Sequence, residues 1–291
     1  MAALAEFEEQ RGRLWGIAYR MTGSVADADD AVQDAWLRWS RLPDGAADDP
    51  RAYLTTVISR ICYDRLTSAR VRREQYIGPW LPEPLVTQEG PEERAALDES
   101  VSVALLTVLE RLSPTERTAL ILHDVFAVPF AEIAEVVGRT PDSVRQAASR
   151  ARRRVRAEAP RRPVERGEHR KVVEAFSAAV MAGDFEGLLK VLDPDVIWRS
   201  DGGGKVIAAR LPVLGAEKVA RFAHHLLRDF HPDRMWMAMR EVNGAPGVLV
   251  ADDATGFAAV FAFTVDQGRI REVNAVLNPD KLSHLDLQAL R

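Results

Sequence analysis

The sequence has almost no cysteine and no long apolar run. Its 291 residues include one cysteine, Cys62, which excludes an internal disulfide and any zinc site built from several cysteines. No window approaches the roughly 18 uncharged apolar residues that a membrane-spanning helix needs. The N-terminus alternates acidic with apolar residues, unlike a signal peptide. We therefore expect a cytoplasmic protein that holds no metal and no cofactor.

The composition is that of a soluble globular protein, with 47% hydrophobic and 28% charged residues and a length sufficient for two or three domains. The net charge of −4 hides an uneven distribution. Residues 51–75 contain six arginines and two acidic residues, and residues 139–158 contain seven arginines and two acidic residues. The segments 1–50 and 76–138 are acidic. Two short basic blocks in an acidic chain are typical of two separate DNA-facing surfaces.

Two segments rich in proline, 76–97 and 159–167, are expected to be linkers because proline and glycine prevent a long regular element. The first linker carries Tyr76, Trp80 and other apolar side chains. Such residues are costly in a solvated linker, so we expect it to dock on a neighbouring domain.

The linkers separate three domains, which we expect at 1–75, 98–158 and 168–291. Apolar residues recur at helical spacing in the first two domains. The third begins with a helix at 168–182 and continues with short β-type runs, of which the last two are joined by a hairpin at Asp266-Gln267-Gly268. The expected strands are Val196–Arg199, Trp236–Val242, Gly247–Ala251, Gly256–Val265 and Arg269–Val276.

A helix-turn-helix is predicted in the second domain. Phe130–Val137 forms an amphipathic helix, Gly138 supplies a left-handed stop, and Thr140 caps a second helix that starts with Pro141. Arginine and glutamine near the start of such a helix can bind base edges, and later arginines suit phosphates. The expected DNA-binding residues are Thr140, Ser143, Arg145, Gln146, Ser149, Arg150, Arg152 and Arg153. The alternative is an ordinary surface helix hairpin.

The motifs of the second domain resemble region 4 of RNA polymerase sigma factors, which binds the minus-thirty-five promoter element. The resemblance rests on Leu109–Arg117, Phe130–Gly138 and Val144–Arg152. In the first domain, Asp27–Leu37 resembles the part of sigma region 2 that grips the β′ subunit of polymerase, and Ala52–Arg65 resembles the part that opens the minus-ten element. The family implied is the extracytoplasmic-function (group IV) sigma factors.

The polymerase-binding stretch has an acidic face opposite an alanine stripe. Asp30, Gln33 and Asp34 surround Leu37 at helical spacing, which suits a basic partner helix. The alternative is a solvated acidic face. The residues that the resemblance assigns to polymerase binding are Asp29, Asp30, Gln33, Asp34, Trp36 and Leu37.

The promoter-opening stretch places aromatic and basic residues on one helical face. Tyrosine rings and a guanidinium can stack on unpaired bases, and further arginines can hold phosphates. The residues expected at the minus-ten element are Tyr53, Thr56, Arg60, Tyr63, Arg65, Arg70, Arg72 and Arg73. The alternative is that each tyrosine is a half-buried packing residue.

The third domain resembles SnoaL-like proteins, which are related to nuclear transport factor 2 and ketosteroid isomerases. The resemblance rests on Ala182–Phe185, Leu189 and Asp195-Val196 and on the strand-rich second half. It implies a curved sheet wrapped on helices around a conical cavity. The fold class expected for the chain is therefore multidomain: two all-α sigma domains, a region 2 helical bundle and a region 4 helix-turn-helix, followed by an α+β SnoaL/NTF2-like cone-shaped domain.

Three further motifs resemble a sigma subfamily with such a tail, often called the ECF41 group. They are Trp80–Pro84, Asp201–Lys205 and Asn278–Leu282. The resemblance implies that the tail contacts the sigma core and tunes its activity in cis. The residues expected to make these contacts are Trp80, Leu81, Pro82, Asp201, Gly202, Gly203, Gly204, Lys205, Asn278 and Pro279. A plain turn between strands is the alternative for the glycine run, which lacks the ending of a phosphate-binding loop.

The leading hypothesis is a sigma factor that binds core RNA polymerase (β′ and β subunits) and promoter DNA, with no membrane contact and no enzyme activity. The alternative is a ligand-sensing sigma factor whose tail cavity binds a small apolar molecule. A catalytic tail would need a base such as Asp201 beside a cavity lined by Trp198, Trp236, Phe257 and Phe261. No tyrosine follows Tyr76, so the tail lacks tyrosine partners for such a base.

Overall fold

The computed structural model describes residues 2–43, 45–73, 76–88, 102–158, 164–227 and 230–291. The chain forms two compact units. Unit 1 comprises Met1–Gln75 and Leu105–Ala159, and unit 2 comprises Tyr76–Ala104 and Pro160–Arg291. The linker that follows the first helical domain therefore belongs to the same unit as the C-terminal domain. Within the described ranges, no helix has the length and apolar content needed to cross a bilayer.

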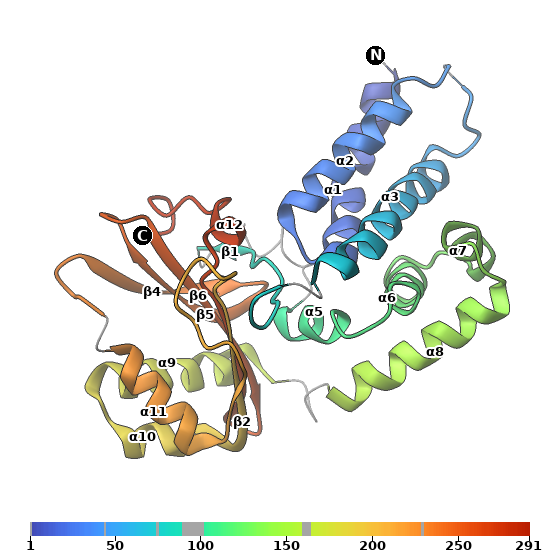
Figure 1. Ribbon diagram of the computed structural model, residues 1–291. Helices are drawn as coiled ribbons and strands as arrows, with labels where there is room; N and C mark the ends of the chain where they lie inside the picture. Colours follow the sequence, from blue (N-terminus) through green and yellow to red (C-terminus); the bar gives the residue numbers. More distant parts are fainter. Residues whose placement is uncertain (1, 44, 74–75, 89–101, 159–163, 228–229) are drawn as a thin grey trace. The chain divides into compact units, whose positions relative to one another are not determined.

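The N-terminal part of unit 1 is a bundle of three helices (Figure 1). They are α1 (Ala2–Thr22), α2 (Val25–Trp39) and α3 (Pro50–Arg73). The predicted alanine stripe of α2 is buried, and small side chains there let α1 and α3 approach closely. The Ser24 hydroxyl caps α2 by accepting a hydrogen bond from the Asp27 N–H at 3.0 Å. Cys62 is buried as expected.

The second part of unit 1 contains the predicted helix-turn-helix. Its elements are α5 (Val103–Leu109), α6 (Pro114–Leu120), the π-helix η1 (Ile121–Val125), α7 (Phe130–Val137) and α8 (Pro141–Glu158). Gly138 ends α7 with a φ of 63°, and the Thr140 hydroxyl accepts from the Ser143 N–H at 3.3 Å. Both features confirm the sequence prediction.

Within unit 1, the two helical parts contact each other through a buried arginine. Arg117 of α6 is 1% exposed. Its Nη1 lies 2.6 Å from a carboxylate oxygen of Glu110, and its Nε donates to the backbone carbonyl of Arg20 in α1 at 3.2 Å. Burial lowers the pKa of this guanidinium, and the carboxylate of Glu110 favours its charged form. Because arginine is ordinarily exposed, this contact could not be predicted from the residue type.

The C-terminal part of unit 2 is a curved sheet with three helices on one face (Figure 1). The helices are α9 (Arg166–Ala182), α10 (Phe185–Val191) and α11 (Ala216–Leu227). The strands are β1 (Val86–Thr87), β2 (Leu192–Asp201), β3 (Val213–Leu214), β4 (Met235–Val242), β5 (Ala245–Asp252), β6 (Phe257–Asp266) and β7 (Arg269–Val276), and a short helix α12 (Pro279–Leu282) follows. Their order is β1-β4-β5-β6-β7-β2-β3. Among the strand pairs of the described residues, β2–β7 is parallel and the others are antiparallel.

Two tight hairpins set the register of this sheet. Gln267 and Gly268 both have positive φ, of 52° and 73°, as the predicted β6–β7 hairpin requires. Asn243 and Gly244 form the β4–β5 hairpin in the same way. The five longer strands match the predicted runs: β7 has the predicted bounds, β6 is shifted by one residue, and β2, β4 and β5 are extended at one or both ends.

The sheet has a core on each face. One core, which includes Trp198 and Phe263, lies between the sheet and α9–α11. The other includes Leu249 and Leu282 and takes in Leu81, a fully buried linker residue. The first linker is therefore part of the C-terminal domain's hydrophobic core, as its apolar composition predicted.

Breaking the buried ion pair of unit 1 should destabilise it. We expect Glu110→Gln to cost about 3–5 kcal/mol, because it leaves the Arg117 guanidinium buried without its carboxylate. Glu158→Gln, which removes a solvent-exposed partner of Arg111, should cost less than about 1 kcal/mol. Urea unfolding followed by helical circular dichroism measures both, and equal costs would contradict the assignment.

Candidate functional sites

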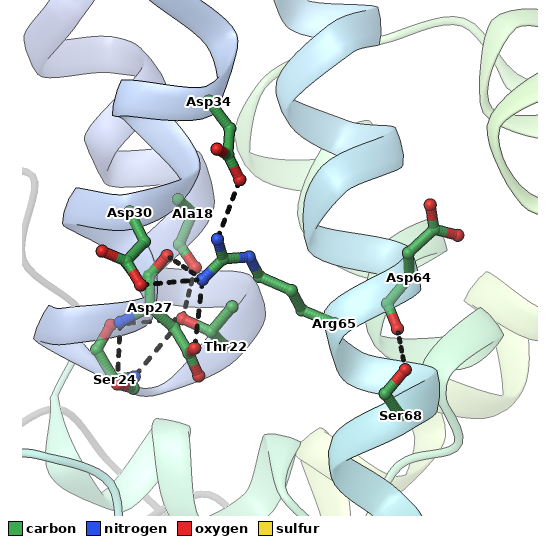
Figure 2. Close-up of polar contacts among 9 residues, drawn as sticks. All are labelled: Ala18, Thr22, Ser24, Asp27, Asp30, Asp34, Asp64, Arg65 and Ser68. Atoms are coloured by element: carbon green, nitrogen blue, oxygen red, sulfur yellow. Dashed lines mark hydrogen bonds and ion pairs between the residues drawn. The ribbon is translucent and has the colours of Figure 1, made fainter.

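The acidic face of α2 is held together by an arginine from α3 (Figure 2). The guanidinium of Arg65 lies 3.2 Å from Asp27, 3.5 Å from Asp30 and 3.0 Å from Asp34. Burial alone would lower the pKa of Arg65, but the hydrogen bond to Asp34 and the neighbouring carboxylates raise it. The side chains of Asp30 and Asp34 stay at least half exposed, so one guanidinium orients carboxylates that still face solvent.

The rest of the predicted polymerase-binding set divides into outward and inward residues. Gln33 and Leu37 are exposed beside Asp30 and Asp34. Two others bind α1: the Trp36 ring packs 5.1 Å from Phe7, and the carboxylate of Asp29 accepts from the Trp15 indole N–H at 2.7 Å. The outward face is therefore acidic with one exposed leucine in it, as the helical spacing predicted.

The predicted minus-ten face of α3 is only partly free. Arg60 is exposed, whereas Tyr53 is half-buried against Trp39 at 5.8 Å. The Tyr63 hydroxyl lies 3.3 Å from that of Thr115 in α6. Thr56 donates its hydroxyl proton to the Ala52 carbonyl at 3.1 Å. Arg65 binds the α2 carboxylates instead of extending from the face. The side chains of Arg70, Arg72 and Arg73 lie outside the described residues.

The outward face of α8 contains both exposed and internally paired arginines. Arg150 binds Glu116 at 2.9 Å, and Arg152 makes a two-bonded pair with Asp124 of η1 at 2.7 and 2.6 Å. The hydrogen bond that Arg152 donates to Asp124 is the main reason that the pKa of Arg152 is raised. Arg145 stays exposed despite an i,i+3 pair with Asp142. The other exposed members of the predicted set are Thr140, Gln146, Ser149, Arg150 and Arg153, and Ser143 is half-buried.

The first linker is bound to the C-terminal domain around a buried carboxylate. Asp201 at the end of β2 has no exposed surface. One of its oxygens accepts from the Leu81 backbone N–H at 2.8 Å and lies 2.7 Å from the Lys281 ammonium. The other accepts from the Tyr76 hydroxyl at 2.5 Å. We call this arrangement, together with Trp80 and Asn278, the linker clasp.

Lys281 of α12 completes the linker clasp from the opposite side. Its Nζ lies 3.3 Å from the centroid of the Trp80 ring and also donates to the Leu81 carbonyl. The amide of Asn278 donates to the Tyr76 hydroxyl at 2.9 Å. Burial, and then the hydrogen bond to Asp201, raise the pKa of Tyr76. A buried charge pair of this kind is stable only when such additional hydrogen bonds satisfy it.

Beyond the clasp, the linker extends the sheet. The Leu85 backbone N–H donates to the side-chain oxygen of Asn243 at 3.0 Å, and the Asn243 backbone N–H donates to the Leu85 carbonyl at 2.8 Å. The next two residues form β1 on the edge strand β4. His284 lies 2.9 Å from the Pro84 carbonyl through Nε2. The linker is therefore recognised by backbone pairing as well as by side chains, in the manner of strand addition.

The glycine run packs where no side chain fits. Gly203 and Gly204 have positive φ, and a Cβ on Gly203 would collide with the amide of Asn278. A Cβ on Gly202 would collide with the carbonyl of Val206, because the chain folds back over it. Lys205 makes an exposed 2.6 Å ion pair with Asp280. Of the other predicted residues, Pro82 is buried with the clasp and Pro279 is exposed at the start of α12.

Sequence reasoning missed three residues of this interface: Tyr76 in the linker, and Lys281 and Asn243 in the C-terminal domain. Lys281 lies inside the quoted motif Asn278–Leu282, but nothing in the sequence showed that its charge is buried. Tyr76 was noted only as an apolar residue in a proline-rich linker. Each of these residues contacts a partner more than a hundred positions away or depends on the geometry of a hairpin. The spacing of residues in the sequence therefore could not predict these contacts.

A conical cavity of about 570 Å³ lies between α9, α11 and the sheet. Asp201 and Trp236 do not line it, which overturns the expectation that Asp201 stands beside this cavity as a base. The Trp236 indole N–H instead donates to Asp253 at 2.9 Å. Asp252 is the acid in the wall, paired with Arg234 at 3.2 Å. Across the described residues, no three His, Cys, Asp or Glu side chains gather into a metal site.

Comparison with known proteins agrees with this geometry. Residues 7–72 match the family Sigma-70 region 2, and residues 102–155 match Sigma-70, region 4. The ECF RNA polymerase sigma factor SigJ of Mycobacterium tuberculosis is 42% identical over 99% of this chain and 96% of its own length. A probable ECF RNA polymerase sigma factor of that organism, SigI, is 36% identical over 97% and 95%.

A solved structure extends the likeness to the whole fold. The crystal structure of SigJ from M. tuberculosis matches with a TM-score of 0.79 and 38% identity, covering 98% of this chain and 99% of that one. These matches confirm the two helical sigma domains and the sigma resemblance of both basic helices, and the sheet with helices on one face agrees with the α+β architecture expected for the tail. The chain belongs to the extracytoplasmic-function sigma factors of RNA polymerase.

Proposed function

We propose that this sigma factor directs core RNA polymerase to specific promoters through α2, α3 and α8, and that the linker clasp regulates this activity in cis. The observation that carries the regulatory part is the fully buried Asp201–Lys281 pair, which holds linker residues Tyr76 and Leu81. Promoter-directed initiation itself follows from family membership. Since sigma factors act on polymerase, the cytoplasm is the expected place of action.

The outward face of α2 is the proposed contact with polymerase. Asp30 and Asp34 offer carboxylates that Arg65 has already oriented, and exposed Leu37 provides an apolar anchor between them. A basic helix with an apolar stripe on the β′ or β subunit would complement such a face. The Arg65 guanidinium would remain between the carboxylates as part of this surface.

Promoter reading is assigned to the residues that stay exposed. Arg145 and Gln146 lie in the first half of α8, where paired hydrogen bonds to base edges are possible. Arg150 is bound to Glu116 and Arg152 is bound to Asp124. Either arginine can bind a DNA phosphate only if the phosphate replaces its carboxylate partner. Among the described side chains expected at the minus-ten element, that of Arg60 is the exposed one.

The clasp can regulate because it uses linker residues that join the two promoter-binding parts. The minus-ten and minus-thirty-five elements are separated by roughly 25 base pairs, or about 85 Å of duplex. Within unit 1 these parts contact each other, through Tyr63–Thr115 and Arg117–Arg20. To reach both promoter elements, the two helical parts must separate. When residues 76–88 of the linker are docked on the C-terminal domain, fewer residues remain to span the distance between the two elements.

The tail is proposed to act as a regulator and not as an enzyme. Asp201, the base that the sequence suggested, binds the linker instead of facing the cavity, and Asp252 in the cavity wall is paired with Arg234. The matches to sigma factors favour promoter-specific initiation over ligand sensing as the function of the chain. The clasp therefore needs no ligand to exert its effect on the linker.

In vitro transcription with purified core polymerase tests the proposal. The whole chain should support initiation from a specific promoter. A chain ending at Gly167 and the variant Asp201→Asn should both change its output in the same direction, because each releases the linker. Asn at 201 leaves the Lys281 ammonium buried without its counter-charge, a loss of about 3–5 kcal/mol that is enough to open the clasp.

Asp195→Asn is the matched control for that experiment. It removes an exposed carboxylate from the same strand and should leave the transcriptional output unchanged. Circular dichroism must show that the Asp201→Asn tail stays folded. Wild-type output from both Asp201→Asn and the shortened chain would disprove regulation by the clasp, and no promoter-dependent RNA from any form would disprove the function itself.

Truncating the exposed leucine of α2 should weaken polymerase binding. We expect Leu37→Ala to cost about 2 kcal/mol, or roughly 30-fold in affinity, because it removes the apolar centre of the acidic face. Leu4→Ala truncates an equally exposed leucine on α1 and should have no effect. Fluorescence anisotropy of labelled sigma factor titrated with core polymerase measures both, and an unchanged Leu37→Ala affinity would refute the assignment.

Arg145 should read promoter sequence. We expect Arg145→Ala to reduce discrimination between the cognate and a mismatched minus-thirty-five element by about 1–3 kcal/mol, because a base-edge contact is lost. Arg156→Ala, an exposed arginine in the last turn of α8, should weaken binding equally on both DNAs. Competition binding at fixed salt distinguishes the two patterns, and uniform weakening by Arg145→Ala would make it a phosphate contact.

A further inference from the structure

A carboxylate from η1 holds one arginine of the recognition helix α8. Both side-chain oxygens of Asp124 accept hydrogen bonds from Arg152, at 2.7 and 2.6 Å. The side chains of Arg152 and Asp124 are 34% and 29% exposed. The pair therefore joins two elements of unit 1 and is mostly shielded from solvent, so salt screens it less than it screens a pair on the open surface.

Arg152 lies on the face of α8 that carries the proposed base-reading residue. Side chains seven positions apart in a helix lie two turns apart on one face, so Arg152 shares a face with Arg145. Arg156, four positions after Arg152, belongs to the same face. Arg145 and Arg156 are exposed. Three guanidinium groups therefore originate from one face of the helix, and Asp124 binds the middle one.

The second carboxylate pair on this face is weaker. Asp142 binds Arg145 at 2.6 Å, but the two residues are three positions apart in one helix, and their side chains are 83% and 60% exposed. Exposed pairs of this kind contribute little and are easily replaced. Asp124 instead comes from a separate element and binds with two hydrogen bonds. Arg145 is therefore available to DNA, whereas Arg152 has a competing ligand.

Asp124 offers Arg152 the same ligand geometry as a DNA phosphate. A guanidinium binds a carboxylate or a phosphate through two parallel hydrogen bonds of about 2.7–2.9 Å. Replacing Asp124 by a phosphate would add no hydrogen bond and would leave the carboxylate without its cation. The π-helical conformation of η1, which is rare and often marks a functional site, sets Asp124 at the position that meets Arg152. The exchange therefore gives little net gain.

We propose that Asp124 is an internal substitute for a DNA phosphate, which keeps Arg152 out of complexes with DNA that lacks the minus-thirty-five element. Non-specific binding comes almost entirely from contacts between basic side chains and phosphates. One contact fewer weakens that binding without changing the base edges that Arg145 can reach. Asp124 is thus a positioning residue that limits sequence-independent affinity. The inference rests on the proposed role of α8 in DNA binding.

The salt dependence of non-specific DNA binding tests the proposal. Fluorescence anisotropy of a labelled duplex without promoter elements, titrated with the full-length protein, gives the affinity at each salt concentration. Asp124→Asn should raise the affinity about 3–10-fold at about 50 mM salt, because it frees Arg152 for a phosphate. The plot of log affinity against log salt should become steeper by about 0.9, the value for one additional phosphate contact. Loss of a purely structural contact would not steepen this plot.

Two further variants control for charge. Glu135→Gln removes the same charge from an exposed position on α7 of the same helix-turn-helix, and it should leave the slope unchanged. The double variant Asp124→Asn/Arg152→Gln removes both charges of the pair and should bind like the wild type. A double variant with lower affinity and a flatter slope would show that Arg152 already binds a phosphate. One that keeps the gain of Asp124→Asn would show a general charge effect, and either result would overturn the proposal.

Arg156→Gln separates failure of this inference from failure of the proposed function. Because Arg156 shares the face of Arg152 and is exposed, its loss should lower the affinity several-fold and flatten the slope by about 0.9. If Arg156→Gln does so and Asp124→Asn brings no gain, Asp124 is only a structural partner and the inference is wrong. If neither variant changes binding, α8 does not face DNA, and the proposed function of this helix is wrong as well.

The wild-type protein allows a test that needs no folded variant. In a nuclear magnetic resonance spectrum of ¹⁵N-labelled protein, the Nε–H signal of Arg152, which is held by Asp124, should keep its position when the same duplex is added. A signal that moves as the duplex binds would show that Arg152 leaves Asp124 for a phosphate, and this would overturn the proposal.

Discussion

The ion pair between Asp201 and Lys281 is the interaction on which unit 2 depends. Two opposite charges without solvent are stable only if every remaining hydrogen-bonding group is satisfied. Here the linker supplies those groups, through the Leu81 backbone and the Tyr76 hydroxyl. A tail that buries this pair therefore needs the linker in place. This requirement gives the NTF2-like domain a specific grip on a segment that would otherwise be an unstructured tether.

Internal ion pairs also shape the sigma domains. Arg65 orients the acidic face of α2, and Arg152 fixes α8 to η1. Both arginines lie in basic blocks that indicated DNA binding, and both already have carboxylate partners within unit 1. These two guanidinium groups are therefore engaged within the protein, whereas those of Arg60 and Arg145 are exposed. Charge density located the two helices correctly without showing which guanidinium groups are free.

The tail combines two faces of one sheet for two purposes. The convex core holds the linker through Leu81, and the opposite face encloses an aromatic cavity. Successive side chains of β2 point to opposite faces of the sheet, so Ser200 lines the cavity and the next residue, Asp201, belongs to the clasp.

The sequence by itself determined the helices, the capped helix-turn-helix, most of the strands, the β6–β7 hairpin and the family, because these depend on local periodicity, turn chemistry and motifs. Only the tertiary structure decided which charges meet. Asp201 changed from a conceivable cavity base to a clasp residue, and Arg65 from a phosphate contact to a carboxylate clamp. Partner choice depends on the approach of residues distant in sequence, such as Tyr76 and Asn278. The spacing of residues in a single sequence does not indicate which distant residues come into contact.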